Sequence, residues 1–523
     1  MNRKFVLLAA FLVLSCFTFA QTTVVNPAGH DVSRPLRDTT PISYAPWDHY
    51  NDHPVMPVPH HSAGGRDTAL QTQAPAPNAV TINSNAGFNG VGVSGGYTIQ
   101  GEPPDTNGSV GTTQYVQWVN TAFGVFDKGT GAKVYPPIGY ANGNTIWSGS
   151  PVGNGRCASD NSGDPIVLFD KQAQRWIFTQ FAVSSRPYYQ CVAVSTTADA
   201  TGSYNRYAYS FGTNFNDYPK VGVWTDGYYF TFNLFARGRT FAGADLCAMD
   251  RTAALAGDPA AKMLCFQTSK SFGGILPADI DGASGAAGTT ALPPAGTPEY
   301  FAGFGSNSLN IWRVTPNYSA GTLAVTGPTS IPVAAFSEAC GGGTCIPQPG
   351  TSQKLDSLAD RLMYRLSYRN FGTYASLLVN HSVTAGASTG VRWYELRDSG
   401  SGPGVYQQGT FAPDSNYRWM GSLGQDKLGN IAVGYSVSSS GLNPSIFMAS
   451  RAPTDVLGVL SSELNLFSGS GSQSGHSRWG DYSSLSIDPV DDCTMWYTTE
   501  YLDQSGDFIW STRFNHFRLG SCQ

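Results

Sequence analysis

The amino-acid sequence predicts an all-β protein and, within that class, a seven-bladed β-propeller. One motif recurs along the chain. Its most complete copy is residues 478–489, RWGDYSSLSIDP, in which a polar turn leads into a short alternating strand. Weaker copies begin near Arg418, Asp217 and Gly163. A unit repeated at a long period indicates an array of similar modules, which is how propellers are built.

The spacing of the modules gives the expected number of blades. Module starts fall near residues 105, 164, 217, 279, 356, 419 and 481, which are 53 to 77 residues apart. Short runs with strand character follow most of these starts. The expected strands are 166–170, 175–182, 188–195 and 204–211; 220–224, 228–236, 244–250 and 262–268; 299–304, 309–315 and 323–325; 361–368, 374–383, 391–397 and 405–411; 431–437, 445–450 and 457–466; and 483–487, 494–501 and 508–517. Six blades with an appended sheet, or an open array of β-sandwiches, are the alternatives.

An N-terminal strand is expected to close the ring. The last module shows only three candidate strands, whereas residues 90–99 supply a surplus strand ahead of the first module. A strand borrowed from the start of the domain would complete the last blade. It would also remove the exposed sheet edges that favour aggregation.

The composition agrees with many strands joined by tight turns. The chain has 523 residues, with 60 Gly, 32 Pro and 26 Tyr, and only 13% of its residues are charged. Its formal net charge is −5. Because binding to nucleic acid requires clustered Lys and Arg, we expect no nucleic-acid partner.

Residues 1–20 are expected to be a secretory signal peptide. A basic start precedes the apolar residues 5–19, which are too few to span a bilayer comfortably, and small residues place cleavage before Gln21. A lipoprotein signal at Cys16 is the weaker alternative. No later stretch is long and apolar enough for a transmembrane segment. The mature protein is therefore expected to be secreted, to the periplasm or the extracellular space.

Residues 21–85 are expected to form a Pro-rich flexible leader, and residues 86–523 the β-propeller domain. The leader has no hydrophobic period, so it cannot bury enough apolar area to offset the entropy of ordering it. We expect it to be solvated, with part of it laid on the domain surface. Five of the eight histidines lie in this leader, which leaves a metal-binding tail as an alternative.

The cysteines of the mature chain predict disulfides. Removal of the signal peptide leaves an even number, which in an exported protein is typical of disulfide bonding. A zinc site would need Cys-x-x-Cys pairs or nearby histidines, and neither is present. The local pairing keeps each bridge within one module and is favoured: Cys157–Cys191, Cys247–Cys265, Cys340–Cys345 and Cys493–Cys522.

Aspartates at the module starts are the first candidates for a binding site. In a propeller, the loops that lead into the innermost strands share one face, so these carboxylates should gather near one end of the axis. They could hold a hard cation such as Ca²⁺, for which Asp281 and Asp481 are the candidate ligands, or accept hydroxyl groups of a sugar. The alternative is turn chemistry, in which Asp accepts backbone N–H bonds. The aspartates are Asp105, Asp164, Asp217, Asp279, Asp281, Asp356 and Asp481.

Arginines supply a second set of candidates. Arg-Trp pairs recur along the chain, and packing between blades is the favoured interpretation of them. A sialidase-like site would need three clustered arginines and a Tyr nucleophile with a Glu partner, and Glu500-Tyr501 could supply the latter. No Ser-x-Asp-x-Gly-x-x-Trp box and no Gly-x-Ser-x-Gly elbow is present. The arginines available for such a cluster are Arg361, Arg365, Arg418 and Arg478.

The motifs resemble those of a group of uncharacterised exported bacterial β-propeller proteins. The resemblance rests on residues 163–170 with Arg175-Trp176, on residues 217–220, and most of all on residues 478–498. It spans roughly residues 86–523 and implies a secreted propeller. The group brings no catalytic residues, and the similarity to sialidases lies at the level of the fold, which does not imply function.

Together these patterns favour a secreted binding or surface-interaction module for an extracellular glycan or protein. The repeated motifs look like packing, and no catalytic set stands out. The alternative is a secreted carbohydrate-active hydrolase or lyase, sialidase-like, with its site at the mouth of the channel; whether the chain is an enzyme is left open. The candidate ligand-binding residues are Asp105, Asp164, Asp217, Asp279, Asp356, Arg361, Arg418, Arg478 and Asp481.

Overall fold

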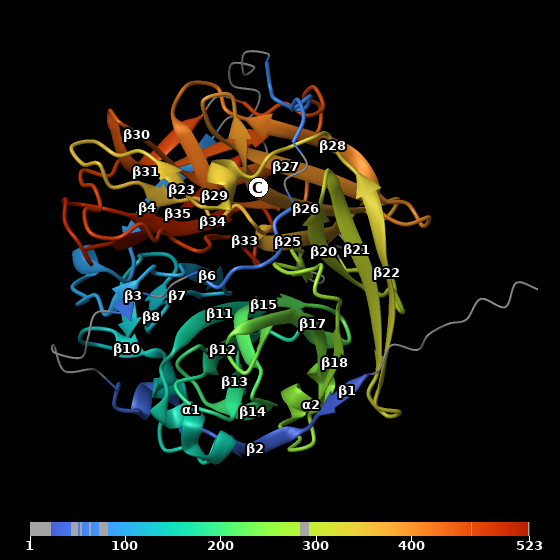
Figure 1. Cartoon of the computed structure of the whole chain (residues 1–523). Helices are drawn as coiled ribbons and strands as arrows, with labels where there is room; N and C mark the ends of the chain where they lie inside the picture. Colours follow the sequence, from blue (N-terminus) through green and yellow to red (C-terminus); the bar gives the residue numbers. More distant parts are fainter. Residues whose placement is uncertain are drawn as a thin grey trace, which may run out of the picture.

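The computed structural model is an all-β molecule (Figure 1). The structure describes residues 22–42, 51–52, 55–61, 64–72, 82–282, 292–461, 463–520 and 522. The expected signal peptide lies outside these residues. Within them, no helix has the length and apolar character needed to cross a membrane.

Three five-stranded sheets form the first part of the domain, and two of them include a strand from the leader. The first contains β6 (Asn107–Val110), β7 (Gln114–Val119), β8 (Ala122–Asp127), β9 (Lys133–Tyr135) and β10 (Ala141–Asn142). The second runs β11 (Gly163–Asp170), β12 (Arg175–Ala182), β13 (Tyr188–Ser195), β14 (Tyr204–Gly212) and β2 (Pro27–Val32). The third runs β15 (Phe215–Val223), β16 (Gly227–Ala236), β17 (Thr240–Asp250), β18 (Met263–Gln267) and β1 (Thr23–Val25).

The second part contains one eight-stranded sheet and two four-stranded sheets. The large sheet runs β22 (Thr322–Pro332), β21 (Ser308–Asn317), β20 (Glu299–Gly305), β19 (Leu276–Ile280), β25 (Met363–Asn370), β26 (Ala375–Ala385), β27 (Ser388–Asp398) and β28 (Gly404–Phe411). Its two halves, the expected fourth and fifth modules, join where β19 pairs in parallel with β25. The others are β29 (Tyr417–Gln425), β30 (Ile431–Ser439), β31 (Leu442–Arg451) and β32 (Leu464–Phe467), and then β33 (Ser484–Ile487), β34 (Met495–Tyr501), β35 (Ser511–Leu519) and β4 (Ile82–Asn89).

Short elements connect these sheets. Two small sheets pair β3 (Asn51–Asp52) with β5 (Gly101–Glu102) and β23 (Thr344–Ile346) with β24 (Leu355–Asp356). The helices are α1 (Arg156–Ser159) and α2 (Arg251–Ala256), with the 3-10 turns η1 (Leu36–Asp38), η2 (Val93–Gly95), η3 (Gly143–Trp147), η4 (Val152–Gly155) and η5 (Ala339–Gly342). Helix α2 begins where Asp250 Oδ1 accepts a hydrogen bond from Ala253 N, which is a standard N-cap.

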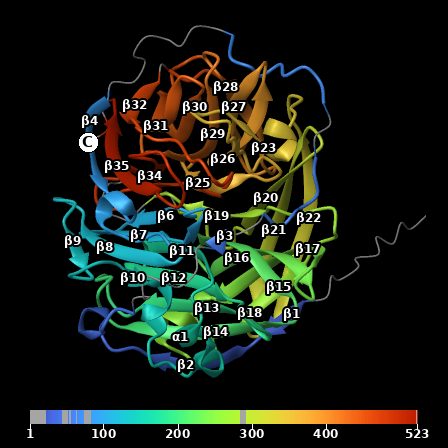
Figure 2. The same cartoon turned by 60° about the vertical axis from the view of Figure 1, so that its left-hand side comes forward.

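The first strand of each module lies beside the first strand of the next module. In chain order these strands are β6, β11, β15, β19, β25, β29 and β33, and each contacts its successor. Strand β33 in turn contacts β6, so the series returns to its starting point. Figure 2 shows β6, β11, β19 and β25 near the middle of the molecule.

A strand from ahead of the first module completes the last sheet, but it is not formed by the expected residues. Strand β4 pairs antiparallel with β35, which places Phe88 opposite Phe514. Residues 90–99 instead contain η2, because Gly92 and Gly96 adopt φ values of 151° and 81°, which interrupt a regular strand. The expectation of a strand at residues 90–99 was therefore wrong by about one strand length.

Part of the leader lies on the domain. Strand β1 pairs with β18 and β2 pairs with β14, so both lengthen sheets at an outer edge (Figure 1). Arg206 anchors β2, since its Nη2 lies 2.6 Å from Asp31 Oδ2. Farther along, Gln71 exchanges two hydrogen bonds with the backbone of Leu460.

The tryptophans of the Arg-Trp pairs are core residues. Trp176, Trp393, Trp419 and Trp479 are each at most 1% exposed. The rings of Trp419 and Trp479, which come from two successive modules, lie 5.7 Å apart between centroids. Because all four rings are buried, packing accounts for the repeated pairs. Truncation of a buried Trp costs about 3–5 kcal/mol.

Four disulfides brace the sheets, with the local pairing that the sequence favours. They are Cys157–Cys191, Cys247–Cys265, Cys340–Cys345 and Cys493–Cys522. Cys247 and Cys265 lie directly opposite each other on the neighbouring strands β17 and β18.

Candidate functional site

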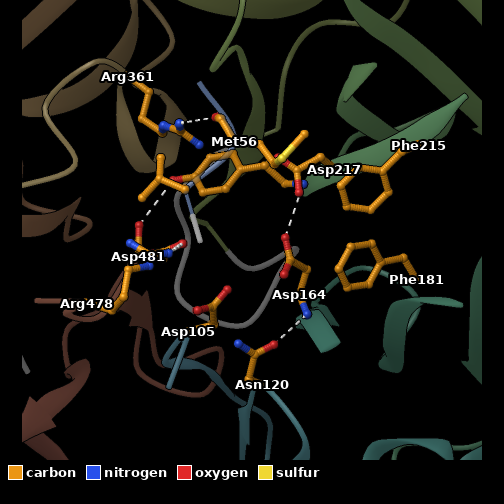
Figure 3. A pocket seen from close by; sticks show the side chains of 12 residues that line it. Met56, Asp105, Asn120, Asp164, Phe181, Phe215, Asp217, Arg361, Arg478 and Asp481 are labelled. Atoms are coloured by element: carbon orange, nitrogen blue, oxygen red, sulfur yellow. Dashed lines mark hydrogen bonds and ion pairs between the residues drawn. The ribbon is translucent and has the colours of Figure 1, made fainter. Parts of the chain in front are cut away.

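A small chamber lies at the starts of β6, β11, β15 and β33. Its volume is about 160 Å³, and Figure 3 shows side chains converging on it from separate sheets. The lining residues are Val55, Met56, Asp105, Asn120, Asp164, Phe181, Phe215, Asp217, Tyr218, Arg361, Arg478 and Asp481. Six of the candidate ligand-binding residues therefore meet here: Asp105, Asp164, Asp217, Arg361, Arg478 and Asp481.

The backbone turns sharply where it delivers these carboxylates. Asp105, Asp164 and Asp481 have φ values of 50°, 45° and 58°, in the left-handed region. Asp is one of the few residues other than Gly that visit this region readily. In β15 the left-handed position belongs to Tyr218, at φ 54°, one residue after Asp217. Conformations of this kind persist only where surrounding contacts impose them, and they are frequent at functional sites.

Asn120 holds the loop of Asp164 in place. Its Oδ1 accepts a hydrogen bond from Asp164 N at 2.9 Å, and its Nδ2 donates to Pro103 O at 3.1 Å. The preceding residue, Gly163, has a φ of 107°, and a Cβ at this position would collide with Asn120 Oδ1. The Gly-Asp order of the motif is thus required by this close approach.

A buried lysine lies beside the carboxylates. Lys220 is fully buried, and its Nζ lies 3.4 Å from the centroid of the Tyr218 ring and 3.8 Å from that of Tyr482. Such cation–π contacts stabilise a desolvated ammonium group. Burial lowers the pKa of Lys220 to about 8, although the charges of Asp164 and Asp105 oppose this shift.

Both arginines of the chamber are held by carboxylates. Arg361 Nε donates to Asp360 Oδ1 at 2.7 Å. Arg478 Nη2 donates to Asp481 Oδ2 at 2.6 Å, and its Nη1 donates to Asp356 Oδ2 at 3.3 Å. Asp356 therefore joins the group through Arg478, without lining the chamber. Because these guanidinium charges are already paired, the site lacks the free arginine cluster that a sialidase-like site would need.

The chamber retains carboxyl oxygens without a partner. Asp105 Oδ1 and Asp481 Oδ1 accept no hydrogen bond within the described part of the chain. Asp105 is only 2% exposed and Asp481 is 9% exposed. Buried carboxyl groups are normally hydrogen-bonded, so these two atoms offer acceptors to a guest in the chamber.

Burial and mutual repulsion raise the pKa values of the chamber acids. Burial, with the charges of Asp481 and Asp164, raises the pKa of Asp105 well above its usual value. Burial, with the charge of Asp164, raises the pKa of Asp217 to about 8. Burial raises the pKa of Asp164 to about 6, while Lys220 works in the opposite direction. Protonated and ionised carboxyl groups therefore coexist in the chamber at neutral pH.

Residues 55–61 of the leader, here called the strap, contribute Val55 and Met56 to the wall of the chamber. Met56 is one of the lining residues, and its carbonyl oxygen accepts a hydrogen bond from Arg361 Nη2 at 3.3 Å. At the other end of the strap, His60 Nδ1 lies 2.7 Å from Glu338 Oε2. The leader thus contributes to the site as well as to the outer edges of the sheets.

Three of the expected site residues, together with Arg365 of the expected arginine cluster, lie elsewhere. Arg365 Nε donates to Asp279 Oδ2 at 2.8 Å, and its Nη2 forms an ion pair with Asp281. Arg418 Nη2 lies 2.6 Å from Glu463 Oε2. Asp279, Asp281 and Arg418 are thus committed to buried ion pairs and do not line the chamber.

Among the described residues, no chamber carboxylate belongs to a group of three side chains that could share a metal ion. In the described part of the chain, two groups of three side chains have ligand atoms within 4.8 Å of one another: Asp245, Cys247 and Cys265, and Glu102, His476 and Asp507. Neither group includes Asp281 or Asp481, the expected Ca²⁺ ligands. The cysteines of the first group are joined in a disulfide, so they are not thiolate ligands.

Sequence reasoning did not single out Lys220, Tyr218 and Tyr482 as members of the site. The signal was present, because Tyr218 and Lys220 follow Asp217 within one motif and Tyr482 follows Asp481 in another. Their proximity depends on two modules meeting across the centre, where Tyr218 and Tyr482 ring centroids lie 5.9 Å apart.

No protein-family model matches the chain, and no curated protein matches it. Among solved structures, the chain is similar to a Hadza microbial sialidase, with 12% identity, a TM-score of 0.34, and coverage of 78% of this chain and 73% of the sialidase. It is similar to the phage phi92 endosialidase, with 9% identity, a TM-score of 0.34, and coverage of 84% and 68%. It is also similar to an endo-arabinase from Bacteroides thetaiotaomicron, with 11% identity, a TM-score of 0.25, and coverage of 56% and 94%. Similarity this low carries no argument about activity.

Proposed function

We propose that this chain is an exported seven-bladed β-propeller that binds a glycan in the axial chamber. One observation carries the proposal: carboxyl groups near the starts of strands from four separate sheets surround one cavity, and among the described residues Asp105 and Asp481 each keep a buried oxygen without a hydrogen-bond partner. Carboxylates that only cap turns would be satisfied by backbone N–H groups.

Seven blades and closure by β4 are supported by the contacts of the first strands. The order β6, β11, β15, β19, β25, β29, β33 and again β6 is what a closed ring of seven modules would have. Pairing of β4 with β35 gives the last module its fourth strand. Such a ring leaves only short sheet edges.

Export is supported by the disulfides. Four disulfides in one chain are typical of proteins that fold in an oxidising compartment. The N-terminal sequence, with its basic start and short apolar stretch, predicts the signal that such export requires.

The size and lining of the chamber suit a sugar ligand better than a protein partner. Carboxylate oxygens accept hydroxyl hydrogen bonds, and Phe181 and Phe215, whose ring centroids lie 5.7 Å apart in a stacked arrangement, line one side. Aromatic rings pack well against the apolar face of a sugar. A cavity of about 160 Å³ admits a small group, whereas protein partners generally need a surface of about 1,000 Å² or more.

Glycoside hydrolysis is a second candidate, favoured by one observation. Asp217, with a pKa of about 8, is protonated at neutral pH, whereas Asp164, with a pKa of about 6, is mostly ionised. One carboxyl group that can donate a proton and one that can accept a proton, in a shared cavity, are what this chemistry requires.

Binding and turnover on a glycan panel test both candidates. Wild type and Asp105→Asn are compared by calorimetry, with Asp258→Asn, an exposed aspartate on another surface, as the matched control. We expect at least tenfold weaker binding for Asp105→Asn and no change for Asp258→Asn. Absence of glycan binding by the wild type would refute the proposal. Product formation that disappears in Asp217→Asn would favour hydrolysis over binding alone.

A further inference from the structure

We propose that the chamber selects a glycan that carries a free, positively charged amine. This inference rests on the proposed glycan binding and specifies the chemical class of the ligand. It comes from the numbers of acidic and basic groups around the cavity and from the two carboxyl oxygens there that, among the described residues, have no hydrogen-bond partner.

Acidic side chains outnumber basic ones around the chamber. Its lining and the residues paired directly with that lining contain six carboxyl groups and three basic groups. The acids are Asp105, Asp164, Asp217, Asp356, Asp360 and Asp481, and the bases are Lys220, Arg361 and Arg478. With every group ionised, the unligated site would carry more negative than positive charge, and protonation or a cationic guest can relieve that surplus.

The three basic groups are already engaged. Arg361 is paired with Asp360, and Arg478 with Asp481 and Asp356. Lys220 Nζ donates to Pro219 O at 3.0 Å and lies between two tyrosine rings. None of these groups donates a hydrogen bond to Asp105 Oδ1, so among the described residues this oxygen remains available as an acceptor.

A bare metal ion would be a poor guest. Among the described residues, the groups of three ligand side chains that fit within 4.8 Å do not include any chamber carboxylate. Hard cations need several oxygen ligands at short distances. An ammonium group on a sugar, by contrast, makes three separate hydrogen bonds, and the hydroxyl groups of the same sugar can reach the remaining oxygens.

Binding of such a ligand would release protons. The titratable and charged groups that face the chamber are Asp105, Asp164, Asp217, Asp356, Asp360, Asp481, Lys220, Tyr218, Tyr482, Arg361 and Arg478. An ammonium group placed among these acids favours their ionised forms, so a carboxyl group that was protonated gives its proton to the buffer. The affinity for an amine should therefore rise with pH over the range in which the free amine itself stays protonated, and that for a neutral sugar should not.

Four probes test the inference on the full mature chain: a glucosamine tetramer, its fully N-acetylated counterpart, cellotetraose, and trilysine. We expect the glucosamine tetramer to bind at least tenfold more tightly than the two neutral sugars. We also expect its binding heat to vary with the ionisation enthalpy of the buffer, since roughly one proton is released. Asp217→Asn should weaken this binding and reduce the proton release, and Asp258→Asn should leave both unchanged.

Each contrary result would lead to a different conclusion about the ligand. Equal binding of the neutral sugars, still sensitive to Asp105→Asn, would overturn the amine requirement and leave glycan binding in place. Tighter binding of trilysine than of the glucosamine tetramer would overturn the inference in favour of a basic peptide. Failure of all four probes would overturn it, and the glycan panel would then decide the proposed function separately. Circular dichroism of Asp105→Asn and Asp217→Asn, both close in shape to the native residue, checks that the variants are folded.

Discussion

Lys220 Nζ lies 3.4 Å from the centroid of the Tyr218 ring, so a cation is held in the interior next to the carboxylates of the chamber. In this contact Tyr218 has two roles, one for its backbone and one for its ring. Tyr218 occupies a left-handed backbone position that shapes the start of β15, and its ring provides a binding surface for the ammonium group. The acids of the chamber depend on this cation for part of their ionisation.

Removal of that cation should increase protonation of the chamber. In Lys220→Met, Asp164 loses its largest pKa-lowering influence, so its pKa should rise above about 6. We expect the infrared band of protonated carboxyl groups to be stronger at pH 7 in the variant than in the wild type. Lys354→Met, at an exposed lysine, is the control and should leave the band unchanged. A band no stronger in Lys220→Met would contradict the assigned role of the lysine.

Arg478 should be important for stability. Its guanidinium group pairs with Asp481 and Asp356, and all three residues are at most 9% exposed. Loss of one partner of a buried ion pair leaves an uncompensated charge and costs about 3–5 kcal/mol. Arg478→Met should therefore lower the urea midpoint strongly, and Arg478→Lys should lower it less. A loss of less than about 1 kcal/mol in Arg478→Met would show that the pair is not needed for folding.

The stability of the unligated protein should fall between pH 5 and pH 8. The pKa of Asp217 is raised to about 8 in the folded chain, above its value of 3.8 when exposed. The folded state thus binds more protons than the unfolded state in this range, and its advantage is lost as pH rises toward 8. Lys220, whose pKa is lowered to about 8, reverses the slope only above that pH.

Thermal unfolding at several pH values measures this effect. We expect the wild-type midpoint to decrease by at least about 2 °C from pH 5 to pH 8. Asp217→Asn, which cannot ionise, should show a smaller decrease. Identical pH profiles for the two proteins would mean that Asp217 is not protonated in the folded state at neutral pH.

The strap should limit access to the chamber. Val55 and Met56 of the strap line the chamber, and Val58, two residues on, is 4% exposed. A charge at this position would favour the detached strap, because burial of an unpaired carboxylate is costly. Val58→Asp should bind the glucosamine tetramer with a faster association rate in stopped-flow experiments. Val134→Asp, at a valine that is 46% exposed, is the control. An unchanged association rate in Val58→Asp would indicate that the ligand enters by another route.

The sequence motifs identified the chamber aspartates, but they also picked out Asp279 and Asp281, which lie outside the chamber. Asp105, Asp164, Asp217 and Asp481 were recognised because each stands at the start of a repeated strand, and repetition fixes equivalent positions around an axis. Asp279 and Asp281 share that position in the chain, yet β19 pairs in parallel with β25 and delivers them to Arg365. Pairing between modules is a long-range property that no local motif records.

The contribution of the leader was also beyond the reach of local patterns. Residues 55–61 have no hydrophobic period, and their contacts beside the chamber are made with Arg361 and Glu338, some 280 to 305 residues away in the chain. Likewise, the strand expected at residues 90–99 lies at β4. Composition indicates that such segments lack a core of their own, but it does not show which surface they will contact.

A crystal structure of the mature protein with the glucosamine tetramer would show where the amine binds. We expect density for one sugar unit in the chamber, with its amine within hydrogen-bond distance of Asp105 Oδ1 or Asp481 Oδ1. Density for the bound tetramer on another surface, with the chamber unchanged, would rule out the chamber as the binding site.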